Sequence, residues 1–304
     1  MRNITSMPAE RKVFLTGLAI AIVGAILFST KAIVAKLIYR YPVDAVTLIA
    51  FRMLFSLPFF LAIAIWQARI SAPLTGSERG KIVLLGLIGY YLSSFLDFLG
   101  LQYISAGLER LILFLTPSFV LLISIVLFDK RIRRVEWWAL LISYTGTVLV
   151  FMHDVRSGGS QVWIGAGFVV GSAIAYAVYL IYSGEMVRRV GALRLVAYAM
   201  CVSSVACILQ FFLLRPISLL IHQPAEVYGL SLVNAVFCTV MPVILTMIAV
   251  ARIGAGTTSQ AGMIGPVSTL FLGAVILEEP ITQIQLIGTL LVLSGIYLLS
   301  RKVT

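Results

Sequence analysis

Charged residues are scarce in this sequence. Asp, Glu, Lys and Arg make up 12% of the 304 residues and apolar residues 61%, whereas about 25% of a soluble domain is charged. The net charge of +11 sits in short loops between apolar segments, which is where membrane orientation signals belong. This composition leaves no room for a soluble domain and argues against nucleic-acid binding.

Catalytic and metal-binding patterns are also missing. Cys201, Cys207 and Cys238 fall inside apolar segments, where we interpret them as small packing residues, and His153 and His222 lie in loops. The sequence contains no HExxH, GxSxG, Walker or CxxC pattern. It therefore predicts no enzymatic activity, no cofactor and no metal.

Ten apolar segments follow one another along the chain. Each is long enough to cross a bilayer, and none shows the period-two alternation of a membrane β-strand. The sequence predicts an all-α membrane protein of ten transmembrane helices, at residues 13–37, 45–66, 82–101, 107–128, 135–151, 162–182, 195–214, 228–250, 256–277 and 284–299.

The distribution of Lys and Arg predicts the orientation. With a cytoplasmic N-terminus, sixteen of these residues fall in inner segments, and the outer loops hold Arg40, Arg156 and Arg215. Cytoplasmic loops carry the excess of positive charge. We expect a multi-pass protein of the bacterial inner (plasma) membrane with both termini in the cytoplasm.

An internal repeat divides the chain. Residues 107–146 match residues 256–295 at a constant offset of 149, which pairs Pro117 with Pro266. The predicted units are residues 1–152 and 153–304, with five spans each. An odd number of spans inverts the second unit relative to the first, and inverted repeats are typical of secondary transporters.

The two repeats resemble a known family. The stretches ISAGLERLILFLTPSFVLLISIVLFDKRI and GAGTTSQAGMIGPVSTLFLGAVILEEPITQIQLIGTLLVLSG are similar to the EamA-type repeat of the drug/metabolite transporter superfamily. The resemblance implies two EamA units around a central cavity and export of amino acids or other metabolites, and it points to the amino-acid exporter (YddG-like) branch. One departure is that the acidic turn reads Asp129–Lys130 in the first repeat but Glu278–Glu279 in the second.

Ionisable residues within spans are the first candidates for a functional site, because charge at membrane depth is costly. All of them fall in the first repeat and in its expected outer half: Lys31, Lys36, Arg52, Asp97, Glu109 and Arg110. They could line a cavity that attracts a carboxylate, or they could pair with one another to hold helices in register. Lys36 could also extend to the interface. The sequence leaves these alternatives open.

Polar and aromatic residues provide further candidates. Tyr90, Ser94 and Asp97 share one face of the third predicted helix, and Tyr176 and Tyr179 share a face of the sixth. With the mid-span Asn234, they suit an amphipathic solute; helix packing is the alternative. Pro117 and Pro266 are candidate hinges for alternating access, or static kinks. Glu109 and Arg110 are candidates for gating or proton coupling.

These features predict a secondary transporter that exports small metabolites, with amino acids, aromatic ones among them, first among the expected substrates. A multidrug or organic-cation exporter is the alternative, and a membrane-embedded enzyme or a channel comes after it. The expected partners are the small-molecule substrate and the lipid bilayer, without nucleic acid. We expect the chain to function as a monomer.

Overall fold

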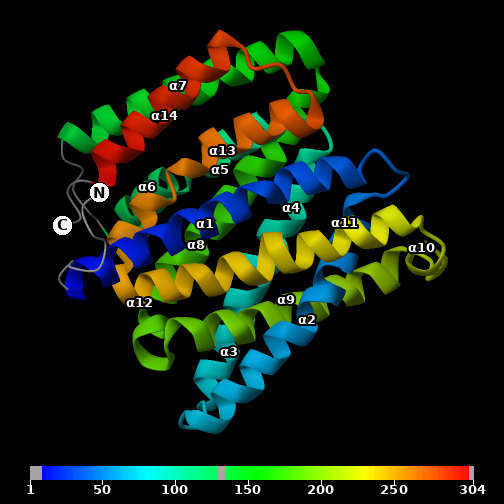
Figure 1. Cartoon of the computed structure of the whole chain (residues 1–304), viewed down its shortest axis with the longest axis vertical. Helices are drawn as coiled ribbons and strands as arrows, with labels where there is room; N and C mark the ends of the chain where they lie inside the picture. The colour runs from blue at the N-terminus through cyan, green and yellow to red at the C-terminus, as the bar shows by residue number, and fades with distance from the viewer. Residues whose placement is uncertain (1–8, 129–133, 301–304) are drawn as a thin grey trace, which may run out of the picture.

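The computed structural model describes residues 9–128 and 134–300, and this part of the chain is helical with no strand (Figure 1). Eight helices are long and apolar enough to cross a membrane, and two shorter apolar helices come after them at Ile264–Leu277 and Gln283–Leu298. The all-α membrane fold is therefore confirmed for the described residues, whereas the count of ten spans stays a prediction. The turn at Asp129 and Lys130 lies outside the described residues.

The elements divide between the two halves of the chain, with π-helical segments marked η. The first half contains α1 (Ala9–Ile38), α2 (Ala45–Ile70), α3 (Gly76–Gly86), η2 (Leu87–Leu92), α4 (Ser93–Leu101), α5 (Ala106–Leu113), α6 (Thr116–Phe128) and α7 (Arg134–Gly158). The second half contains α8 (Gln161–Val190), α9 (Ala192–Leu214), α10 (Ser218–Ile221), α11 (Ala225–Ala235), η3 (Val236–Val240), α12 (Met241–Ala261), α13 (Ile264–Leu272), η4 (Gly273–Leu277) and α14 (Gln283–Ser300).

Side-chain caps fix two of the short turns between helices. Asp44 Oδ1 accepts a hydrogen bond from the Thr47 backbone N–H at 2.9 Å where α2 begins. Ser105 Oγ accepts one from the Leu108 N–H at 3.1 Å where α5 begins. Each cap supplies an acceptor that the first turn of a helix lacks. We call the end of the bundle where α1 ends and α2 and α5 begin the charged end, because five of the buried charged side chains lie towards it: Lys31, Arg52, Asp97, Glu109 and Arg110.

The fourth predicted span consists of α5 and α6, which are separated by a two-residue turn, and Pro117 lies in the first turn of α6. The ninth predicted span contains the end of α12 and then α13 after a two-residue turn, and Pro266 lies in the first turn of α13. Gly254, with a φ of 78°, interrupts α12 before this span begins. Proline is tolerated in a first turn because its missing N–H has no partner there in any case. Each proline thus follows a short irregular turn within its span, and its role as a hinge or as a static kink stays a prediction.

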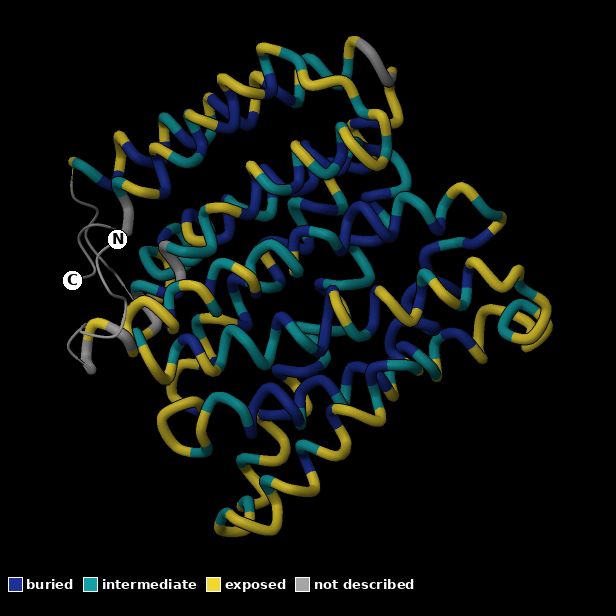
Figure 2. Tube along the Cα trace, viewed as in Figure 1, coloured by how far each residue is buried: buried dark blue, intermediate teal, exposed yellow. Residues whose placement is uncertain are grey.

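Helices from the two halves pack against each other in pairs. α1 lies along α11, η3 and α12, while α8 lies along η2 and α4; α2 packs with α9, and α5 with α13. α7 and α14 form a pair at one edge of the bundle (Figure 1). Their backbones approach closely, since a Cβ on Gly146 would lie 2.5 Å from the Gly288 carbonyl oxygen. The buried core sits in the centre, where α1, α2, α4, α9, α11 and η3 meet (Figure 2).

Candidate functional site

Lys31 of α1 lies between two carboxylates from other helices. Its ammonium forms ion pairs with Asp97 of α4 and with Glu109 of α5, whose Oε1 lies 3.5 Å from Lys31 Nζ. The rings of Phe28 and Phe98 face the ammonium, with centroids 5.3 and 5.4 Å away. All three charged side chains are buried. The structure thus brings together three candidates that are far apart in the sequence.

Arg110 of α5 connects this cluster to the second half of the chain. Its Nη2 donates to Ser29 Oγ at 2.8 Å. The single Ser29 hydroxyl proton is shared between the carbonyl oxygens of Ala25, at 2.8 Å, and of Gly265 in α13, at 3.2 Å. A Cβ on Gly265 would lie 3.2 Å from Arg110 Nη2, so the guanidinium rests directly on the α13 backbone. Both halves therefore meet at this residue.

Lys31, Asp97, Glu109 and Arg110 together form what we call the charge network. Its two cations and two carboxylates balance, which lowers the cost of burying them, since an unpaired buried charge is strongly destabilising. Hydrogen bonding within it is incomplete. Among the described residues, neither Glu109 oxygen nor Arg110 Nε has a hydrogen-bond partner. Glu109 is therefore held mainly by the Lys31 and Arg110 charges beside it.

Arg52 of α2 is buried next to the charge network and has different partners. Its Nε donates to Thr239 Oγ1 at 2.8 Å, and its Nη1 donates to Ser94 Oγ at 3.5 Å. These partners are hydroxyls, and no carboxylate of the described chain lies within ion-pair distance. Thr239 lies in η3 and donates to the backbone carbonyl of Asn234 at 2.9 Å. The buried Asn234 amide has no partner of its own in the part of the chain described.

The tyrosines of the third and sixth predicted helices pack on one another. The Tyr90 and Tyr179 hydroxyl oxygens are 3.3 Å apart, and the Tyr176 and Tyr179 rings stack at 5.5 Å between centroids. The Tyr179 ring lies directly on Gly89, where a Cβ would clash. In this conformation the three rings form a contact between η2 and α8, which is the packing alternative left open by the sequence.

The structure separates Tyr90 from Ser94 and Asp97, which were predicted to share one helix face with it. Tyr90 lies in η2 and contacts α8, Ser94 accepts from Arg52 of α2, and Asp97 pairs with Lys31 of α1. A π-helical segment adds a residue to the turn and rotates the rest of the helix about its axis. Tyr90 is therefore rotated relative to Ser94 and Asp97, which both lie after η2, in α4.

Comparison with known proteins identifies the family. The profile of the EamA-like transporter family matches residues 15–152 and 163–301. The chain belongs to this family. The uncharacterized transporter YcbK of Bacillus subtilis (strain 168) is 30% identical over 276 residues, which cover 90% of this chain and 88% of that protein. An uncharacterized transporter of Archaeoglobus fulgidus is 26% identical over 222 residues, covering 73% and 78%.

A solved crystal structure shares the fold of this EamA-like transporter. The TM-score is 0.66 at 18% identity, and the match covers 95% of this chain and 98% of the other. The identity is too low to carry a function from that protein. The family and its named relatives establish a transporter role, and the substrate must be argued from the chain itself.

Two partners in the site carried no signal in the sequence. Ser29 is a common residue in a span, and Gly265 contributes a backbone carbonyl. Phe28 also escaped notice, although its ring faces both Lys31 and Arg110, with centroids 5.3 and 5.0 Å from the charged groups. Small and apolar residues are too frequent in membrane helices for their partners to be singled out.

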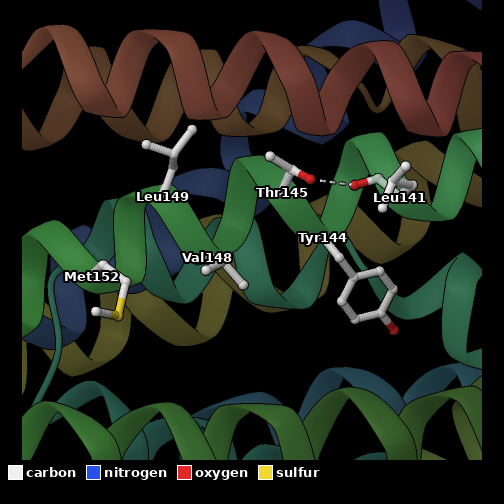
Figure 3. Close-up of a pocket in the computed structure, with 6 residues that line it drawn as sticks. All are labelled: Leu141, Tyr144, Thr145, Val148, Leu149 and Met152. Atoms are coloured by element: carbon white, nitrogen blue, oxygen red, sulfur yellow. Dashed lines mark hydrogen bonds between the residues drawn. The ribbon is translucent and has the colours of Figure 1, made fainter.

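The groove in Figure 3 is not suited to a polar solute. Its volume is about 390 Å³, and α7 supplies all of its lining residues, namely Leu141, Tyr144, Thr145, Val148, Leu149 and Met152 (Figure 3). The Thr145 hydroxyl donates to the Leu141 carbonyl of the same helix at 2.7 Å, and the Tyr144 ring packs edge-on against Phe119 at 6.3 Å. An open apolar groove of this kind fits acyl chains of the surrounding lipid.

Proposed function

We propose that this EamA-like transporter is a secondary transporter that exports small metabolites, amino acids first among them, across the bacterial inner membrane. It works by alternating access between two inverted halves of five spans, with both termini in the cytoplasm. The charged end of the bundle then faces outwards. The family establishes transport; direction, substrate and mechanism are our proposal.

The symmetry of the packing supports the inverted halves. The first span of each half lies along the third span of the other, and the second, fourth and fifth spans pack with their counterparts. The π-helical segments occupy equivalent positions: η3 begins at Val236, which lies 149 residues after the start of η2 at Leu87. This is the offset of the sequence repeat. α1 begins and α14 ends at the same end of the bundle (Figure 1), as an even number of spans requires.

The charge network carries the proposal of alternating access. It closes the charged end with side chains from α1, α4 and α5, and Arg110 reaches through Ser29 to Gly265 of the other half. In an alternating-access transporter, one half rocks against the other around a fixed site. A closed outer gate built from exchangeable ion pairs and one bridging arginine is suited to such a movement.

The charges also favour a substrate with a carboxylate. Arg52 is a buried cation whose described partners are hydroxyls, so an anionic group would replace no existing ion pair. The structure gives less support for a substrate with an aromatic side chain, because Tyr90, Tyr176 and Tyr179 pack against one another in this conformation. For proton coupling, Asp97 and Glu109 are the candidate carriers.

Efflux from proteoliposomes tests this function. Vesicles containing the protein are loaded with radiolabelled amino acids one at a time, and efflux is measured with and without a pH gradient. We expect accelerated, saturable efflux of at least one amino acid. Asp97→Asn together with Glu109→Gln should abolish any dependence on the gradient. No response to any amino acid would refute the proposed substrate class.

An organic-cation exporter is the second candidate, and one observation favours it. Glu109 is fully buried without a described hydrogen-bond donor, and the Phe28 and Phe98 rings beside the network already face a cation. Aromatic faces attract quaternary ammonium groups. Efflux of ethidium from the same vesicles, abolished by Glu109→Gln and indifferent to amino acids, would support this candidate over the first.

A further inference from the structure

A polar cavity lies at the charged end, beyond the charge network. Its volume is about 310 Å³, at the lower end of the range of about 300–1,000 Å³ for small-ligand sites. Residues from α1, from the turns after α1 and α4, and from the segment around the end of η4 line it: Lys36, Tyr39, Arg40, Gln102, Leu277 and Glu279. Both halves of the chain therefore contribute to its walls.

Opposite charges face this cavity without forming an ion pair among the described residues. Lys36 and Arg40 supply two cations and Glu279 a carboxylate. Glu279 Oε1 accepts from the Ala106 backbone N–H at 3.4 Å; within the described residues Lys36 forms neither an ion pair nor a hydrogen bond. Burial raises the pKa of Glu279. The hydrogen bond from the Ala106 N–H and the nearby Lys36 charge lower it, but they offset only part of that rise. The two signs of charge stand apart, with space between them.

The cavity is placed to receive a solute that has passed the charge network. Lys36 follows Lys31 by five residues in α1, about 7.5 Å along the helix at 1.5 Å per residue. The Tyr39 hydroxyl donates to the backbone carbonyl of Phe98 at 2.7 Å, next to Asp97 of the network. A wall of the cavity is thus fixed to the helix that carries one of the gating carboxylates. Opening the network would expose the substrate path to this cavity.

We propose that this cavity is an exit site for zwitterionic amino acids. The substrate carboxylate binds Lys36 and Arg40, and its ammonium group binds Glu279. The Gln102 amide lies at the same wall and can hydrogen-bond either group. Hydrogen bonds between charged groups are stronger than those between neutral groups. A solute that carries both charges is therefore held at two points, whereas a solute that lacks one of the charges is held at one point. This inference rests on the proposed export of amino acids.

Three probes separate the two contacts. Right-side-out membrane vesicles containing the full chain are loaded with radiolabelled phenylalanine. The external concentration that half-maximally accelerates efflux is then measured for phenylalanine, for N-acetylphenylalanine, which lacks the ammonium, and for phenylalanine methyl ester, which lacks the carboxylate. Lys36→Gln should raise this concentration for phenylalanine and the N-acetyl compound about ten- to hundredfold, and leave the ester unchanged. Glu279→Gln should raise it for phenylalanine and the ester, and leave the N-acetyl compound unchanged.

Neighbouring charges outside the cavity provide matched controls. Glu278→Gln removes the exposed acid next to Glu279, and Lys81→Gln removes an exposed lysine at the other end of the bundle. Neither should change the response to any probe. An equal loss for all three probes in the Lys36 or Glu279 variant would show a structural role and overturn the exit site, as would no change. If the unaltered protein responds to no probe at all, the proposed function fails together with the site.

Discussion

Replacing Lys31 should disturb the charge network more than any other single change, because its ammonium contacts both carboxylates. At the 3.5 Å that separates Lys31 Nζ from Glu109 Oε1, an effective dielectric near 20 gives an attraction of about 5 kcal/mol. Desolvation offsets part of this attraction. Removing one partner of a buried pair nevertheless costs about 3–5 kcal/mol, because the other charge stays behind. We therefore expect Lys31→Met to lower the free energy of unfolding by about 3–5 kcal/mol.

A double-mutant cycle makes this prediction specific to the ion pair. Asp97→Asn removes a charge that Lys31→Met would strand, so the two changes together should cost about 1–3 kcal/mol less than their sum. The free energy of unfolding is measured by SDS titration in mixed micelles. Lys36→Met is the control on the same helix, because Lys36 makes no ion pair with the described residues, and should cost less than about 1 kcal/mol. Additive losses, or a small loss for Lys31→Met, would refute a network held by these pairs.

Three further predictions concern packing and pH. Gly265→Ala places a methyl group 3.2 Å from the guanidinium of the network, so thermal unfolding should show a loss of about 1–3 kcal/mol; Gly229→Ala, which meets nothing within 4 Å, should not. Gly146→Val should destabilise the α7–α14 pair by about 1–3 kcal/mol, seen as a lower unfolding midpoint, and an unchanged midpoint would contradict that close contact. Burial raises the pKa of Asp44, but hydrogen bonds from Thr47 and the Arg215 ion pair lower it further, so the net shift is downwards. Stability from this pair should be present above the unfolded pKa near about 3.9 and lost as the pH falls through the lower folded value. Because both side chains are partly exposed, the loss should stay below about 1 kcal/mol. It should become smaller in Arg215→Gln but persist in part, because the Thr47 hydrogen bonds remain; an unfolding titration over pH 2–5 with no difference between the two proteins would contradict the contribution of Arg215.

Hydropathy alone was sufficient to find the members of the charge network. Lys31, Asp97, Glu109 and Arg110 stand out because a charge inside an apolar segment is rare and costly, and the structure brings all four together. The sequence could not say which charge pairs with which, since the partners come from different helices. The Ser29 hydroxyl that accepts from Arg110, and the Gly265 carbonyl that accepts from Ser29, belong to residue types too common in membrane helices to be noticed.

Predictions of which side chains share a helix face were wrong where the backbone departs from 3.6 residues per turn. The third predicted helix contains η2, and Tyr90 within it packs against α8, whereas Ser94 and Asp97 in α4 reach α2 and α1. The prolines were located correctly along the chain, but the short irregular turn before each of them could not be placed from the sequence. Glu279 was not selected as a site residue from the sequence either, because it lies outside the predicted spans. It faces the polar cavity because of the way the segment after η4 folds.

Counterflow in proteoliposomes tests alternating access most directly. Vesicles containing the protein are preloaded with a high concentration of unlabelled amino acid, and labelled amino acid is added outside. A transporter with one site that alternates between the two faces should accumulate the label transiently above its external concentration, and the initial rate should saturate. A flux that rises linearly with concentration and never overshoots would identify a channel and contradict the account.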